Sequence, residues 1–242
     1  MRLLEQIVQY KKEQINHITI NKKRNRPIFS LKDFFKSDKV NIIAEVKLQS
    51  PSFGAFKIDP FYVANIYQKY AKGISVLTDD GFFGGGFELL EKLSKINLPI
   101  LAKDFFIDKK LIDKAFVCGA DIILLIVRIL DDEKLLELYD YAIQLGLDVL
   151  VEVHSLDELE KIKPLKPAVV GINSRDLDSL SISLKKAKNI LKNVDFECIK
   201  IAESGIKTKK DIEFFGTSAD GFLIGEALLE GDVEEKFREF LG

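Results

Sequence analysis

A glutamate and a lysine close an apolar run near residue 45 of the chain. Glu45 and Lys47 follow Ile42 and its apolar neighbours and precede the turn-forming segment Ser50-Pro51-Ser52. In an extended strand, residues two positions apart share a face and lie roughly 6.5 Å apart. A carboxylate and an ammonium group presented side by side do not suit an apolar core. We interpret the pair as part of a site that handles an anionic substrate.

Similar polar side chains close other apolar runs. Strand alternation places Lys103 on the same face as Leu101, and Glu152 on the same face as Leu150. The same reasoning adds Asn173, Arg175 and Glu203 to the inward-facing set. A single lysine of this kind would indicate a structural ion pair. Several charges of both signs indicate a functional site instead, with lysines that nearby carboxylates keep protonated.

These residues require a scaffold that brings strand ends together, and the chain after residue 40 has the pattern of one. Short β-branched runs predict strands at about 41–47, 74–78, 99–103, 121–127, 148–153, 168–173, 198–203 and 220–225. Helical spacing predicts helices at about 60–72, 87–96, 109–118, 132–145, 156–162, 183–192, 208–215 and 232–241. Ser155 with Glu158 and Thr208 with Asp211 have capping-box spacing, and Asp108 and Asp131 are candidate N-caps.

Eight strand–helix units in succession predict a parallel sheet closed into a (β/α)8 TIM barrel, an α/β fold. An open doubly wound sheet is the alternative, but no GxGxxG sequence follows the first strand. Catalytic groups of barrels lie at the carboxyl ends of the strands. We therefore expect residues 1–242 to form one domain, with a helical extension over 1–40 and the barrel over 41–242.

The first 40 residues lie outside the repeat. An amphipathic pattern at helical spacing predicts a first helix from Leu3, Leu4, Ile7, Val8, Lys11, Ile15 and Ile18. A second, shorter helix is expected from Ser30 to Lys36, capped by Ser30 and Asp33. We expect both helices to pack over one end of the barrel.

Two further segments suggest ligand contacts. Ser204-Gly205 and Gly225 follow the last two predicted strands, where barrels often bind phosphate through backbone N–H groups. Residues 79–87 contain three consecutive glycines and Phe83, which predicts a mobile loop whose aromatic rings cover an aromatic ligand.

Composition excludes several classes of protein. A net charge of −2 argues against a general nucleic-acid or membrane binder. The apolar run 122–127 is far shorter than the roughly 20 residues of a membrane helix, and Glu5 interrupts any signal peptide. Cys118 and Cys198 lack metal-site spacing and are expected to be small buried thiols. We expect a cytoplasmic, soluble protein.

The residues closely resemble the indole-3-glycerol-phosphate synthase family of tryptophan biosynthesis. The motifs that carry the resemblance run in the family's order through residues 43–54, 76–79, 101–105, 121–127, 151–154, 171–177, 202–206 and 221–228. The resemblance implies ring closure, decarboxylation and dehydration of 1-(2-carboxyphenylamino)-1-deoxyribulose 5-phosphate, without metal or organic cofactor. It implies an anionic phosphosugar substrate and no nucleic-acid or membrane partner. We expect a monomer, with association with other tryptophan-pathway enzymes left open.

The resemblance also implies roles for individual residues. Lys103 is similar to the family's general acid, and Glu45 and Glu152 to its carboxylates. Lys47 would bind phosphate or assist proton transfer, Asn173 would hold sugar hydroxyls, and Glu203 would support the network. The substrate-binding residues implied are Ser50 and Arg175 for the carboxylate, Phe83 in the loop, and the main chain of Ser204, Gly205, Gly225 and Glu226 for the phosphate.

Two positions depart from the family pattern, and two other functions remain open. Gly84 and Gly86 replace polar loop residues, and Leu48 replaces a residue that is often basic. Another phosphosugar barrel, in which Lys103 forms a Schiff base, is one alternative. A non-catalytic barrel within a multienzyme assembly is the other.

Overall fold

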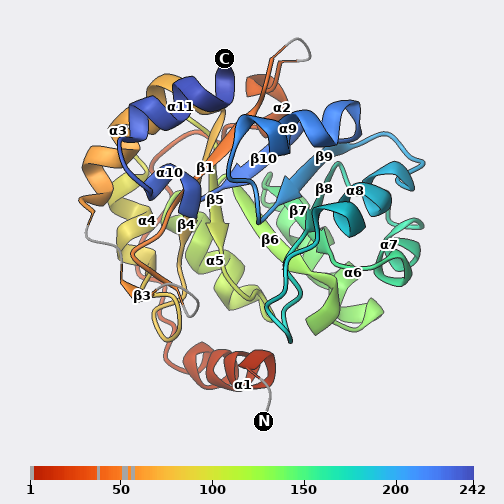
Figure 1. The fold of residues 1–242 in the computed structure, drawn as a ribbon. Coiled ribbons are helices and arrows are strands. Elements are labelled where there is room, and N and C mark those ends of the chain that lie inside the picture. The colour runs from red at the N-terminus through yellow and green to blue at the C-terminus, as the bar shows by residue number, and fades with distance from the viewer. Residues whose placement is uncertain (1–2, 37–38, 51–53, 56–57) are drawn as a thin grey trace.

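The computed structural model describes residues 3–36, 39–50, 54–55 and 58–242, which contain a closed barrel of parallel strands (Figure 1). Strand β1 pairs with both β4 and β10, and this double pairing closes the sheet in the order β1-β10-β9-β8-β7-β6-β5-β4. The barrel strands are β1 (Ile42–Val46), β4 (Gly73–Leu77), β5 (Ile100–Lys103), β6 (Ile122–Ile126), β7 (Asp148–Val153), β8 (Val169–Asn173), β9 (Ile199–Glu203) and β10 (Gly221–Ile224). The predicted (β/α)8 barrel is confirmed.

Helices alternate with these strands as the sequence predicts. They are α3 (Pro60–Tyr70), α4 (Phe87–Leu93), α5 (Lys109–Val117), α6 (Asp132–Gln144), α7 (Leu156–Ile162), α8 (Leu184–Lys192), α9 (Lys209–Phe215) and α11 (Val233–Leu241). The predicted caps form, because the Asp108 and Asp131 side chains accept from backbone N–H groups of α5 and α6. Ser155 caps α7, and the Asp211 carboxylate accepts from the Thr208 N–H.

Several short elements were not predicted. The turn η1 (Val127–Ile129) follows β6, the turn η2 (Gly216–Ser218) follows α9, and the short helix α10 (Glu226–Leu229) follows β10. Residues after β1 form a small antiparallel pair, β2 (Gln49–Ser50) with β3 (Gly54–Ala55).

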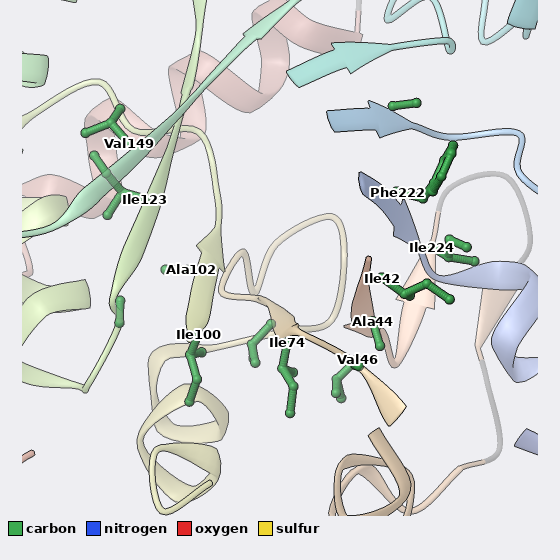
Figure 2. Close-up of a cluster of buried hydrophobic side chains, with 14 of the residues drawn as sticks. Ile42, Ala44, Val46, Ile74, Ile100, Ala102, Ile123, Val149, Phe222 and Ile224 are labelled. Atoms are coloured by element: carbon green, nitrogen blue, oxygen red, sulfur yellow. The ribbon is translucent and has the colours of Figure 1, made fainter. Parts of the chain in front are cut away.

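Strand alternation separates two apolar layers. Side chains such as Ile42, Ala44 and Ile100 face the helices, and Figure 2 shows members of this outer layer. Ile43 and Leu101 belong to the inner cluster that fills the barrel. The predicted inward and outward faces are confirmed. Since burying one such side chain stabilises a fold by about 1.5–3 kcal/mol, this alternation fixes the register of each strand and hence the direction of its last polar residue.

The two N-terminal helices lie at opposite ends of the barrel, so the expectation that both pack over one end is wrong (Figure 1). Helix α1 (Leu3–Ile15) reaches the carboxyl ends of the strands, where Lys11 lies against Asp79 and Asp104. Helix α2 (Leu31–Phe34) lies at the amino ends, where the Leu31 N–H donates to Asp148 at 2.7 Å.

The connection between these helices is fastened by buried charges. Arg24 and Arg26 lie 2.6 and 3.0 Å from the two carboxylate oxygens of Asp121, at the start of β6. Asp121 also accepts from the backbone N–H groups of Phe29 and Ile100. The predicted Ser30 side-chain cap does not form, because the Ser30 hydroxyl donates to Asp148 instead.

The two cysteines are free thiols that differ in burial. Cys118 is buried and Cys198 is half-buried, and neither forms a disulfide. Within the described ranges, every helix is too short or too polar to cross a membrane.

We predict that Asp121→Ala lowers the free energy of unfolding by about 3–5 kcal/mol, because Arg24 and Arg26 would remain buried without their carboxylate. Urea denaturation at neutral pH measures this change. Glu137→Ala, which removes an exposed pair with Lys109 and Lys134, is the control and should change the free energy of unfolding far less. Equal effects of the two substitutions would contradict the prediction.

Candidate active site

A cavity opens at the carboxyl ends of the barrel strands, where the polar residues were predicted to meet. Twelve of the predicted site residues line it: Glu45, Lys47, Phe83, Lys103, Glu152, Asn173, Arg175, Glu203, Ser204, Gly205, Gly225 and Glu226. The side chain of the remaining one, Ser50, lies outside the described part of the chain. Apolar side chains at the ends of the inner cluster, such as Leu124 and Leu223, form the floor.

Lys103, the last residue of β5, is surrounded by carboxylates. Burial alone would lower the pKa of its ammonium group. The charges of Glu45 and Glu152 oppose this effect and raise the pKa of Lys103 above its ordinary value. Lys103 is therefore a cation that faces the cavity, as expected for a proton donor held ready at neutral pH.

Glu152 and Glu203 form a buried pair of carboxyl groups on β7 and β9. Gly171, on the strand between them, makes room for this pair, because a Cβ atom there would collide with Oε1 of Glu203. Burial raises the pKa of Glu203, and the neighbouring charge of Glu152 raises it further. Burial also opposes ionisation of Glu152, but His154 and Lys103 outweigh it and lower the pKa of Glu152 to about 2. The two carboxyl groups are therefore unequal, with Glu152 ionised and Glu203 holding the proton.

A second group of charges lies across the cavity mouth. Nζ of Lys47 is 3.4 Å from Oε1 of Glu45 and 3.5 Å from Oε1 of Glu226. The other oxygen of Glu226 is 3.5 Å from the Arg175 guanidinium. The sequence assigned only the main chain of Glu226 to the site, whereas its side chain bridges the two cations.

The turns after β9 and β10 bring main-chain groups to the cavity. Ser204 and Gly205 both have positive φ, at 63° and 75°. A Cβ atom on Gly205 would lie 2.5 Å from Ile182, and one on Gly225 would lie 2.7 Å from Oε1 of Glu45. The positive φ at Gly205 and the close side chains at both positions favour glycine, so the backbone itself forms this part of the wall.

The loop after β4 is anchored by Asp79. Its Oδ1 accepts from the N–H groups of Phe82 and Phe83, which places the Phe83 ring 6.0 Å from that of Phe105. A Cβ atom on Gly85 would collide with the Leu77 carbonyl oxygen. The glycine run was predicted to make this loop mobile, but at Gly85 glycine serves close backbone packing.

Helix α1 supplies part of the site that sequence reasoning missed. Leu3, Leu4 and Ile7 line the cavity. Lys11 is fully buried, with Nζ 3.0 Å from Asp79 and 2.7 Å from Asp104, the residue after Lys103. Lys11 interrupted an otherwise apolar stripe, and this was the signal available in the sequence. A buried lysine needs a carboxylate partner, but the sequence does not say which one.

His154 was also missed. It follows Glu152 by two positions, and its Nε2 atom lies 3.2 Å from Oε1 of Glu152. The sequence analysis predicted no role for this histidine in the site. The two-residue spacing that paired Glu45 with Lys47 would have paired Glu152 with His154 as well.

Comparisons with known proteins agree with the geometry. The family model described as indole-3-glycerol phosphate synthase matches residues 2–240. A protein of that name from Sulfurisphaera tokodaii is 46% identical over 224 residues, covering 90% of this chain and 91% of the relative. Relatives of the same name from Staphylococcus haemolyticus and Lactococcus lactis are each 40% identical, covering 98% and 96% of this chain and 96% and 91% of their own lengths.

We predict that Lys11→Met releases helix α1, because methionine keeps the bulk of the side chain but leaves Asp79 and Asp104 buried without their cation. Removing one partner of a buried pair costs about 3 kcal/mol, so amide exchange in α1 should accelerate roughly a hundredfold. Hydrogen exchange measured by mass spectrometry tests this, with the exposed neighbour Lys12→Met as control. Unchanged protection of α1 in Lys11→Met would show that the buried charges do not hold the helix.

Proposed function

The chain belongs to the indole-3-glycerol phosphate synthase family, and we propose that the cavity at its barrel mouth performs the reaction with Lys103 as general acid. The enzyme is a carboxy-lyase of tryptophan biosynthesis. It converts 1-(2-carboxyphenylamino)-1-deoxyribulose 5-phosphate into indole-3-glycerol phosphate with loss of CO₂ and water. The observation that carries the assignment of roles is the ammonium of Lys103 facing three carboxyl groups in one cavity.

Ring closure is the first step. The ring carbon that bears the carboxylate attacks the ribulose carbonyl carbon, and a C–C bond forms. Lys103 donates its proton to the carbonyl oxygen as that bond forms. The raised pKa of Lys103 ensures that the proton is present, and the carboxylates around it stabilise the positive charge that develops on the substrate.

Decarboxylation and dehydration complete the indole ring. Loss of CO₂ returns the electrons of the broken C–C bond to the ring, and the hydroxyl group formed from the carbonyl then departs as water. As the hydroxyl leaves, the carbon next to the nitrogen loses a proton and the double bond of the indole ring forms. Glu152, the ionised member of its pair, is suited to accept that proton, while Glu45 faces the same intermediate. Lys47, within 3.4 Å of Glu45, can return a proton to the departing hydroxyl or bind phosphate.

Substrate binding uses the rest of the rim. We assign the phosphate to the main chain of Ser204, Gly205, Gly225 and Glu226, because all four residues line the cavity in the turns after the last two strands, where barrels often bind phosphate. Asn173, whose Oδ1 accepts from the backbone N–H of Arg175, would hold sugar hydroxyls. Arg175, together with Ser50, would orient the carboxylate, Phe83 would cover the aromatic ring, and Glu203 would support the network.

Binding of the substrate must rearrange one part of the rim. The Glu226 carboxylate lies between Lys47 and Arg175, the two cations assigned to the substrate's anionic groups. A phosphate or carboxylate that pairs with either cation replaces Glu226 as its partner. In this structure, the Glu226 carboxylate partly neutralises the charges of Lys47 and Arg175.

We also propose that the enzyme works as a cytoplasmic monomer. Among the described residues, its exposed large apolar side chains lie on five outer helices, α3, α6, α7, α9 and α11, and at Ile20, Leu180 and Ile182 outside them. Sedimentation of the mixed proteins tests association with other tryptophan-pathway enzymes.

We predict that Lys103→Ala and Glu152→Gln each lower kcat by about 10²–10⁴ while binding of an unreactive substrate analogue stays within about tenfold. Indole fluorescence, followed after addition of the carboxyphenylamino substrate, measures turnover. The exposed substitutions Lys110→Ala and Glu133→Gln are matched controls on outer helices. Turnover like that of the unmodified enzyme in either active-site variant would refute the role given to that residue.

A further inference from the structure

His154 lies directly behind the catalytic cavity without lining it. It follows β7, and its side chain is almost fully buried, with 2% of the residue exposed. Its ring lies between two carboxylates: Nε2 is 3.2 Å from Glu152 and Nδ1 is 3.5 Å from Glu158. Nothing in the mechanism above uses this histidine.

The position of the ring favours the charged imidazolium form. A neutral imidazole carries one N–H, and its other nitrogen is an acceptor that would face a carboxylate lone pair. The imidazolium instead carries a positive charge that attracts both carboxylates, and its two N–H groups face them at 3.2 and 3.5 Å, although neither contact has hydrogen-bond geometry. Two anions on opposite edges of one buried ring therefore call for the protonated form.

Glu158 is itself held by a chain of opposite charges. Its carboxylate accepts from the backbone N–H of His154 at 2.6 Å, and its other oxygen lies 2.9 Å from the Arg128 guanidinium. Arg128 also lies 3.3 Å from Asp176, the residue after Arg175. The chain runs from Glu152 through His154, Glu158 and Arg128 to Asp176, and it links the strand of Glu152 to the loop of Arg175.

Other charged groups face this part of the molecule. Glu203 on β9 and Lys103 on β5 share the cavity with Glu152. On the other side, Arg175, Asp176 and Lys186 line a small polar hollow together with His154. Among the described acidic side chains, only Glu152 and Glu158 have an oxygen within 4.0 Å of a ring nitrogen of His154, so these two carboxylates dominate its electrostatic environment.

We propose that His154 is a positioning residue of this enzyme: its imidazolium holds Glu152 ionised and in place, so that Glu152 rather than Glu203 receives the substrate proton. The inference rests on the proposed role of Glu152 as the proton acceptor. His154 acts through Glu152. Without this cation, Glu152 and Glu203 would be two buried carboxyl groups with little to decide which of them is ionised.

The pKa directions agree with this geometry. Burial lowers the pKa of His154, but Glu152 and Glu158 outweigh it and raise the pKa to about 9. A raised pKa in the folded state stabilises the fold fully below the unfolded-state value of about 6.5. This contribution is lost as pH rises through about 9.

The first test is an NMR pH titration of the imidazole protons in the full chain. The sequence contains two histidines, His17 and His154, so His17→Asn assigns both signals. We expect His154 to titrate near pH 9, and Glu152→Gln to lower that value by at least one unit. A His154 signal that titrates at its ordinary value, or that ignores Glu152→Gln, would overturn the inference.

The second test is the kinetics of His154→Asn, with His17→Asn as the control expected to behave as the unmodified enzyme. Loss of the cation should leave part of Glu152 protonated at low pH. The kcat of the variant divided by the kcat of the unmodified enzyme should therefore rise at least threefold from pH 5.5 to 8.5. This ratio is used because ionisation of the substrate affects both enzymes equally and cancels. A uniform loss at every pH would indicate a merely structural role and overturn the inference.

The two hypotheses can fail separately. Suppose that the Glu152→Gln variant turns over normally while His154 of the unmodified enzyme titrates near pH 9. The role of Glu152 is then wrong, but the ion pair between His154 and Glu152 stands. If Glu152→Gln is inactive and His154 titrates at its ordinary value, only the positioning role is wrong. Should His154→Asn fail to fold, the titration of the unmodified chain decides alone.

Discussion

The site depends on a balance of buried charges at the barrel mouth. The ammonium of Lys103 stays charged there because the carboxylates of Glu45 and Glu152 raise its pKa. The carboxylate of Glu152 stays charged in turn because Lys103 and His154 face it. Removing any member leaves its partners as uncompensated charges in a poorly solvated place, which costs several kcal/mol. The charged residues therefore act as one unit, and the protonation state of each is set by the others.

The barrel achieves this balance through strand alternation. The same register that points Leu101 and Leu150 into the apolar interior points Lys103 and Glu152 into the cavity one step later. The apolar layer below excludes water and strengthens the electrostatic interactions above it. Helix α1 closes part of the cavity from outside and is fastened by Lys11, whose partner Asp104 directly follows Lys103. The residue that holds helix α1 thus directly follows Lys103 in the chain.

Much of this arrangement follows from local patterns in the sequence. Period-two alternation and the repeated strand–helix unit predicted the barrel, the inward faces and the polar residues at the strand ends. The glycine-containing turns and the family resemblance supplied the rest of the twelve predicted residues that line the cavity. What the sequence could not predict are contacts between distant segments. Ser30 hydrogen-bonds to Asp148, and α1 and α2 lie at opposite ends, because partners far along the chain decide both. The Glu226 side chain likewise depends on Lys47, 179 residues away. The contact between His154 and Glu152 could have been predicted, because the two residues are two positions apart and follow the same strand alternation.

The most direct test of the charge balance is the protonation state of Lys103 itself. NMR of lysine side chains labelled with ¹³C and ¹⁵N, assigned with Lys103→Ala, follows its ammonium group as the pH is raised. The balance predicts that Lys103 in the unliganded enzyme loses its proton above the ordinary lysine value of about 10.4. A Lys103 that loses its proton well below that value would be a neutral amine near physiological pH, and the role of Lys103 as the proton donor would be contradicted.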